Sequence, residues 1–213
     1  MAFCMNNKFL LTRPNHDQTV RYISTWAEKV KSFAEKKNFT VWDLKNNRAK
    51  RKHLESMLKK QDPSLVFLNG HGGSNSVAGQ DNEILVSVGD NEDIFDGRVV
   101  YSLSCCSGRE LGPALVKNGT KAFIGYREDF IFSYDEKCCT RPEQDMVADK
   151  FLDPSNQVII SLLKGHEPKE SCLNAKKSFF RNIRKMLSSQ SSSLESSSVR
   201  YLIWDMQNLV CLE

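Results

Sequence analysis

The stretch that decides the fold is Leu65-Val66-Phe67-Leu68-Asn69-Gly70-His71-Gly72-Gly73. Its apolar residues follow one another without alternation, which is typical of a short strand buried on both faces of a sheet. The run ends abruptly, and glycines flank the histidine on both sides. We therefore predict a central strand over residues 64–68 that leads directly into a loop carrying His71.

A second stretch has the same design. An apolar run over residues 98–104 ends at Cys105-Cys106-Ser107-Gly108. Ligands of open α/β sheets bind beyond the carboxyl ends of the strands. If the two strands are neighbours, His71 and Cys105 emerge at the same edge of the sheet.

The remainder of the chain alternates between short apolar runs and amphipathic segments. We predict further strands over residues 8–12, 39–42, 84–88, 121–126, 201–204 and 209–212. We predict a helix that begins after Asp17, and others over residues 48–60, 110–117, 144–152, 156–164 and 171–187, with a break at Pro154. A serine-rich loop is expected over residues 188–198. The alternation predicts one α/β domain over residues 1–213, with a mostly parallel sheet and helices on both faces.

The composition limits the class of protein. With 213 residues, 40% of them hydrophobic and 26% charged, the chain is similar to an ordinary globular domain and unlike a disordered or collagen-like chain. No apolar run approaches the ~18–20 residues needed to cross a bilayer. No secretory signal is visible, so we expect no membrane partner. Seven cysteines, two adjacent pairs among them and none at C-x₂-C spacing, indicate reduced thiols in a cytoplasmic protein.

The charge gives little support to a nucleic-acid partner, and we expect none. The net charge of +4 is mild. The basic residues of segment 48–60 are typical of a solvated helix face. His16, His53 and His166 are expected to be surface or capping residues.

Chemistry is expected to depend on His71 and Cys105. A thiolate is a strong nucleophile, and an imidazole exchanges protons near neutral pH. The glycines would let a peptide backbone approach, and the amides of Gly72 and Cys105 are candidates for an oxyanion site. The helix after Gly108 is expected to lower the pKa of the Cys105 thiol. The alternative is a turn histidine beside two buried, small hydrophobic cysteines.

Together the two motifs resemble those of the caspase-like cysteine peptidases of clan CD. In that family a hydrophobic strand ends in His-Gly, and a later strand ends in a small residue and then cysteine. Residues 111–125 and 204–212 are most similar to the gingipain-like and CHAT protease branches. The family usually has one cysteine at this turn. Aligning Ser104 with the small residue selects Cys105 over Cys106.

The resemblance implies a three-layer caspase-like fold and a cysteine endopeptidase. Cys105 would attack the scissile carbonyl of a protein or peptide, and His71 would chiefly protonate the leaving amine. Neither a metal nor an organic cofactor is implied, and no third catalytic residue is evident. The alternative is a catalytically silent domain that binds proteins, and a regulatory protein partner is compatible with both. A thiol acyltransferase would share the two residues without cleaving peptides.

Members of these branches commonly cleave after basic residues, so the resemblance implies Arg or Lys at P1, the residue before the cleaved bond. A basic side chain needs a carboxylate in a partly desolvated pocket. Asp81 is the first choice, because its loop follows His71 and can fold back over the sheet edge. Glu128 and Asp129, which follow the fifth strand, are the reserve choices. Each of the three is otherwise a solvated loop acid.

Overall fold

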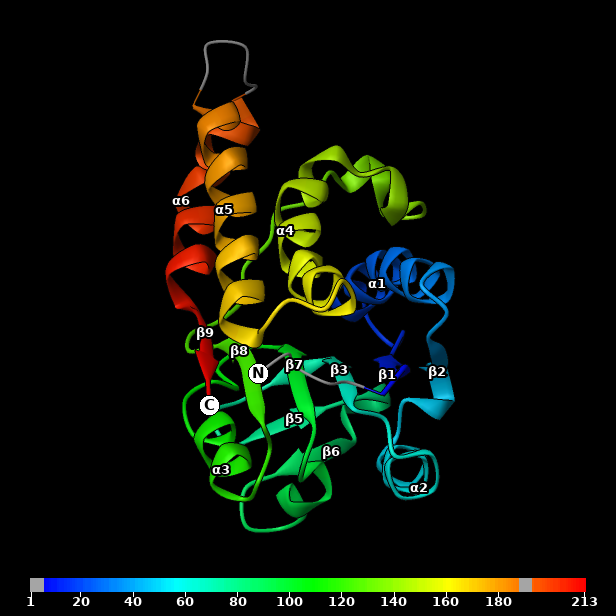
Figure 1. The fold of residues 1–213 in the computed structure, drawn as a ribbon. Coiled ribbons are helices and arrows are strands. Elements are labelled where there is room, and N and C mark those ends of the chain that lie inside the picture. The colour runs from blue at the N-terminus through cyan, green and yellow to red at the C-terminus, as the bar shows by residue number, and fades with distance from the viewer. Residues whose placement is uncertain (1–5, 188–192) are drawn as a thin grey trace.

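The computed structural model describes residues 6–187 and 193–213, and Figure 1 shows its layers. The main sheet contains β1 (Lys8–Arg13), β2 (Thr40–Lys45), β3 (Leu65–Asn69), β7 (Val99–Leu103), β8 (Ala122–Tyr126) and β9 (Leu209–Leu212). A smaller sheet contains β4 (His71–Gly72), β5 (Ser76–Ala78) and β6 (Ile84–Ser87). The helices are α1 (Gln18–Lys36), α2 (Arg51–Gln61), α3 (Leu111–Lys117), α4 (Met146–Leu163), α5 (Pro168–Met186) and α6 (Ser193–Asn208).

The main sheet has the strand order β2-β1-β3-β7-β8-β9. Neighbouring strands from β2 to β8 are parallel, and β9 is antiparallel to β8. Strands β3 and β7 are the two central strands, and every residue in them is buried. The predicted central strands and the mostly parallel sheet are therefore confirmed.

Helices cover both faces of the main sheet. One hydrophobic cluster joins alternate strand residues to α1, α4 and the first turns of α5, and includes Phe67 and Tyr101, whose rings stack at 5.0 Å. A second cluster joins the intervening strand residues, such as Val66 and Val100, to α2, α3 and the small sheet. Because consecutive strand residues point to opposite faces, an uninterrupted apolar run supplies both clusters. The predicted three-layer α/β fold is confirmed.

Helix α1 begins where the sequence predicts, because Asp17 caps it. The Asp17 side chain accepts a hydrogen bond from the Val20 amide at 3.0 Å, an interaction that contributes about 1 kcal/mol to helix stability. The predicted apolar stripe of the helix is buried: Val20, Ile23, Ala27, Val30 and Ala34. The cap fixes the position of Asp17 beyond the carboxyl end of β1.

Helix α4 corrects the predicted break at Pro154. The helix continues from Met146 to Leu163 with this proline inside it. A proline within a helix leaves the carbonyl four residues earlier without its usual amide donor. Here the side-chain amide of Asn182, on α5, donates to that carbonyl, Lys150 O, at 2.8 Å. A partner distant in sequence therefore satisfies the group that the proline leaves free.

The C-terminal segment also differs from the prediction. Residues 201–204, predicted as a strand, belong to α6, as do residues 193–198 of the predicted serine-rich loop. Residues 188–192 of that loop lie outside the described residues. Val199 and Leu202 lie one helical turn apart, so the helix places both on the same face. That face is buried against Phe179 and Ile183 of α5. Figure 1 shows α5 and α6 side by side, extending away from the sheet.

The other elements differ from the predictions mainly at their ends. Helix α2, for example, begins at Arg51 because residues 46–48 form a separate 3₁₀ turn. The predicted strand over residues 209–212 is confirmed as β9. Within residues 6–187 and 193–213, no helix combines the length and the apolar character that crossing a bilayer requires. The single domain over residues 1–213 stays a prediction.

Candidate active site

The structure places His71 and Cys105 side by side in the sheet register. Strands β3 and β7 pair in parallel with Asn69 opposite Leu103. Each candidate residue lies two positions beyond its member of that pair, at the carboxyl edge of the sheet. Adjacent strands lie about 4.8 Å apart. The prediction that these two strands are neighbours in the sheet is therefore confirmed.

The loops that carry these residues touch directly, and glycine makes the contact possible. A Cβ atom at Gly72 would lie 2.4 Å from the carbonyl oxygen of Cys105 and 2.8 Å from Cβ of Ser104. At Gly70 it would lie 1.9 Å from the carbonyl oxygen of Ala78. Both glycines thus make room for this chain's own backbone. The expectation that they clear space for a substrate is corrected for these two positions, whereas Gly73 has only the Ser76 hydroxyl nearby, at 3.9 Å.

His71 has a carboxylate partner that the sequence analysis missed. His71 Nε2 lies 2.6 Å from Asp17 Oδ2. Burial opposes the shift, but hydrogen bonds from His71 and from the Val20 amide lower the pKa of Asp17. The ionised carboxylate accepts, so Nε2 carries the proton and Nδ1 is left to accept one. Strand β1 lies beside β3, which brings the ends of both strands to one edge. In the sequence, the only signal was the position of Asp17 shortly after the first predicted strand.

His16, expected to be a surface or capping residue, extends this group. Its side chain is only 12% exposed, and its Nε2 lies 3.4 Å from Asp17 Oδ2. The same nitrogen lies 3.2 Å from Asn82 Oδ1. The rings of His16 and His71 meet edge to face, with centroids 5.9 Å apart. We call His16, Asp17 and His71 the imidazole side of the site.

The thiol side contains Cys105, Cys106 and Asp129. Burial raises the pKa of the Cys105 thiol to about 11, and the nearby Asp129 carboxylate adds to the rise. The expected lowering by a helix terminus is therefore wrong. Helix α3 begins only at Leu111, and the amides of Glu110 and Leu111 donate to Ser74 O at 3.1 and 2.9 Å instead.

Cys106 occupies a different position from its neighbour. Its backbone is left-handed, with φ of 56°, a conformation that costs a residue other than glycine roughly 1 kcal/mol. Its amide donates to Glu128 O at 3.1 Å, and its thiol donates to Asp129 Oδ1 at 3.2 Å. Both thiols face the loop after β8, because Cys105 Sγ lies 4.0 Å from Phe130 O. Cys105 differs in that it occupies the position in register with His71.

The two expected oxyanion donors are available for that role. Gly73 N donates to Ser76 O at 2.9 Å. Hydrogen-bonded positions alternate along an antiparallel pair, so the Gly72 N–H is directed away from β5. The amide of Cys105 has no acceptor among the described residues. Both amides lie where the two loops meet.

The three acidic candidates for substrate recognition lie in different surroundings. Asp81 forms an ion pair with Lys50, with Oδ2 3.1 Å from Nζ. Glu128 forms an ion pair with Arg109. Of the three side chains, only the Asp129 carboxylate accepts a hydrogen bond from a cysteine thiol, and Asp129 is exposed. The structure therefore brings one of the two reserve choices, Asp129, to the thiol, and not the first choice.

Helix α6 holds the loop that carries Asp129. The Trp204 indole donates to Asp129 O at 3.0 Å, and the Asp205 carboxyl group accepts from the Ile131 amide at 3.0 Å. The Arg127 amide donates to Asn208 O at 3.0 Å. Helix α6, which includes the predicted strand residues 201–204, therefore supports the loop on the thiol side.

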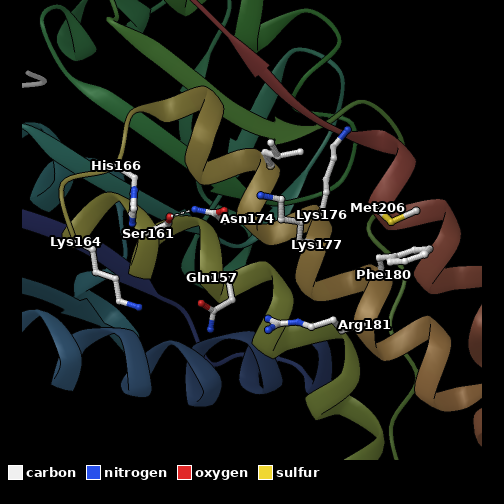
Figure 2. Close-up of a pocket in the computed structure, with 11 residues that line it drawn as sticks. Gln157, Ser161, Lys164, His166, Asn174, Lys176, Lys177, Phe180, Arg181 and Met206 are labelled. Carbon is white, nitrogen blue, oxygen red and sulfur yellow. Dashed lines mark hydrogen bonds between the residues drawn. The ribbon is translucent and has the colours of Figure 1, made fainter. Parts of the chain in front are cut away.

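A groove of about 650 Å³ lies on the helical layer (Figure 2). It is lined by α4, the loop after it, α5 and α6, and its lining includes Lys164, Lys177, Phe180, Arg181 and Met206. None of its lining residues comes from the loops after β3 or β7. The groove is therefore separate from the candidate active site.

Comparison with solved structures agrees with this fold. The structure of the Arg-specific cysteine proteinase gingipain R (RgpB) matches with a TM-score of 0.61 and 10% identity, covering 95% of this chain and 45% of that one. The complex of the Porphyromonas gingivalis RgpB pro- and mature domains matches with a TM-score of 0.59 and 10% identity, covering 95% and 46%. The chain thus shares the caspase-like fold of these structures and spans less than half the length of their chains. No protein-family profile and no curated protein matches it.

Proposed function

We propose that the chain is a cysteine endopeptidase that acts on proteins or peptides through Cys105 and His71. One observation carries the proposal. The two residues follow adjacent parallel strands in the same register, and the Asp17 carboxylate holds the imidazole. A nucleophile, a proton-transfer group and a group that orients it are what thiol acyl transfer requires.

In the proposed mechanism, His71 Nδ1 takes the proton of the Cys105 thiol as Sγ attacks the scissile carbonyl. Asp17 stabilises the imidazolium that forms, as a carboxylate does in a catalytic triad. The amides of Gly72 and Cys105 donate to the oxyanion. The imidazolium then protonates the leaving amine, which leaves a thioester on Cys105. Water activated by His71 hydrolyses the thioester and restores the thiol.

The high thiol pKa determines when the nucleophile forms. With a pKa of about 11, the free enzyme holds Cys105 as a neutral thiol at pH 7. Deprotonation therefore accompanies substrate binding instead of preceding it. A substrate that displaces the Asp129 carboxylate or neutralises its charge would favour the thiolate.

We propose that P1 is Arg or Lys and that Asp129 is its partner. Asp129 is the acidic candidate beside the cysteines, and it has no basic ion-pair partner among the described residues. The neighbour named above as Arg-specific agrees with a basic P1. Peptides with Arg, Lys, Asp or Ala at P1 test this. Asp129→Ala should reduce kcat/KM for Arg and Lys only, and Asp81→Ala should not. A preference for Asp at P1 would contradict the assignment.

A second candidate function is binding without catalysis, and the half-buried, neutral Cys105 thiol favours it. A cleavage profile on a peptide library separates the two functions. The active chain should cleave library members, and Cys105→Ala should cleave none. If the two give the same profile, the peptidase proposal fails and the binding function stands.

We also propose that the chain works in a reducing compartment such as the cytoplasm. All six cysteines in the described part of the chain are free: Cys105, Cys106, Cys138, Cys139, Cys172 and Cys211. Fractionation of the source cells, with the chain detected by antibody, tests the location. Recovery from an oxidising compartment would contradict it.

A further inference from the structure

Three metal-binding atoms converge on the imidazole side of the site. They are His16 Nε2, Asp17 Oδ2 and His71 Nε2, and all three lie within 4.8 Å of one another. Asp17 Oδ2 lies between the rings, 3.4 Å from His16 Nε2 and 2.6 Å from His71 Nε2. Two segments far apart in sequence supply them, the loop after β1 and strand β4.

This arrangement is close to the geometry of a zinc site. Zinc binds imidazole nitrogen and carboxylate oxygen at about 2.0–2.2 Å, so tetrahedral ligand atoms lie roughly 3.3 Å from one another. The separation between His16 and Asp17 already matches. The bond between Asp17 and His71 must lengthen, and their side chains, 38% and 39% exposed, have room to rotate.

The surroundings of the cluster favour a cation. Asn82 Oδ1 lies 3.2 Å from His16 Nε2, so a second oxygen faces the same nitrogen. Two imidazoles with one carboxylate leave a fourth position for water or for this amide oxygen. His16 has no part in the proposed mechanism, although its ring is largely buried beside His71.

We propose that Zn²⁺ binds His16, Asp17 and His71 and holds the peptidase inactive. Coordination takes the lone pairs of His16 Nε2 and His71 Nε2, so in each neutral ring the proton moves to Nδ1. His71 Nδ1 then cannot accept the proton of the Cys105 thiol, and Asp17 no longer stabilises an imidazolium. The inhibitory part of this inference rests on the proposed function, whereas the binding part does not.

Zinc binding is measured on the Cys105→Ala chain, freed of metal, by competition with a chromogenic chelator. The expected result is one tight Zn²⁺ per chain. His16→Gln should weaken binding by roughly 10–100-fold or more, the scale on which metal sites respond to altered ligand shells. The matched control is His166→Gln, because His166 pairs with Glu170 away from the site and its loss should leave the affinity unchanged. Equal affinities in all three chains would overturn the proposal.

X-ray absorption at the zinc edge supplies a readout that needs no histidine variant. The Cys105→Ala chain loaded with one Zn²⁺ should show a nitrogen and oxygen shell that includes two imidazoles. A sulfur shell would place the ion on the cysteines and overturn the proposal.

Peptide-cleavage assays with and without Zn²⁺ distinguish a failure of the zinc site from a failure of the proposed peptidase function. Zn²⁺ should inhibit the unmutated chain and His166→Gln alike, with activity restored by a chelator. If Zn²⁺ binds at this cluster but the chain cleaves no peptide, the metal site stands and the proposed function fails. If the chain cleaves peptides and Zn²⁺ does not bind, the metal site fails and the function stands.

Discussion

The imidazole side and the thiol side of the candidate site differ in how charges and burial affect their titratable groups. On the imidazole side, hydrogen bonds lower the pKa of Asp17 despite its partial burial, so a charged partner already holds His71. On the thiol side, burial and Asp129 raise the pKa of Cys105 to about 11. Under the proposed function, one side is arranged for proton transfer, and the other keeps the proposed nucleophile protonated. On that proposal, substrate binding would complete the site.

The largest effect is expected from removing the imidazole. His71→Ala should lower kcat/KM by roughly 10²–10⁴, the usual scale for the loss of a general acid–base group. Peptide cleavage kinetics measure this, and circular dichroism checks the fold. A folded variant with full activity would show that the prepared side has no catalytic role.

Removing only the charge of Asp17 tests whether its carboxylate acts on His71 in addition to capping α1. Asp17→Asn keeps a good N-cap for α1, so the melting temperature should change little while kcat falls by about 10-fold or more, through loss of the imidazolium partner. The contrasting variant, Asp17→Ala, also loses the cap and should lose about 1 kcal/mol of stability. Unchanged kcat in Asp17→Asn would mean that this carboxylate is only a cap.

The thiol side is tested by titration. Because a nearby carboxylate disfavours the thiolate, Asp129→Asn should lower the pKa of Cys105 from its value of about 11. Alkylation of Cys105 by iodoacetamide, followed by mass spectrometry from pH 7 upward, measures the midpoint. The control is Glu128→Gln, since Glu128 is engaged with Arg109 and should shift the midpoint less. A midpoint that does not move in Asp129→Asn would contradict the electrostatic account.

The smallest effect is expected on the free energy of unfolding, from changes at Asp205, which supports the loop on the thiol side. Burial raises the pKa of Asp205 well above its ordinary value, so the folded chain holds a proton that the unfolded chain releases above about pH 4. The free energy of unfolding therefore falls as the pH rises from about 4 to the pKa of Asp205 in the folded chain. Urea unfolding should find Asp205→Asn more stable than the natural chain at pH 7, with the gain fading toward pH 4.

Asp205→Ala is the contrasting variant. It leaves the Ile131 amide without its acceptor and should lose about 1–3 kcal/mol. Equal stability of Asp205→Asn and the natural chain at both pH values would show that the buried carboxyl is not protonated.

Much of the fold could be predicted because its signals are local. The apolar run of β3 identified a central strand, and Asp17 identified the start of α1. The errors arose where distant residues decide the structure. Asn182 satisfies the carbonyl that Pro154 leaves free, and α5 buries one face of α6, whose apolar residues 201–204 alone are typical of a strand.

The same distinction applies to the site. The register of β3 and β7 follows from the order of the strands, so His71 and Cys105 could be paired from sequence. Asp17 was recognised as a cap, but its contact with His71 joins residues that only the adjacency of β1 and β3 brings together. The thiol pKa was predicted in the wrong direction because burial and Asp129 depend on the packed loop after β8.

Covalent trapping tests the central claim most directly. The unmutated, zinc-free chain is incubated with an acyloxymethylketone peptide that carries Arg at P1, and the labelled residue is identified by mass spectrometry. The account predicts one adduct, on Cys105, that is lost in Cys105→Ala and His71→Ala and retained in Cys106→Ala. An adduct on Cys106 would move the nucleophile by one residue. No adduct on either cysteine, in a folded chain, would contradict the account.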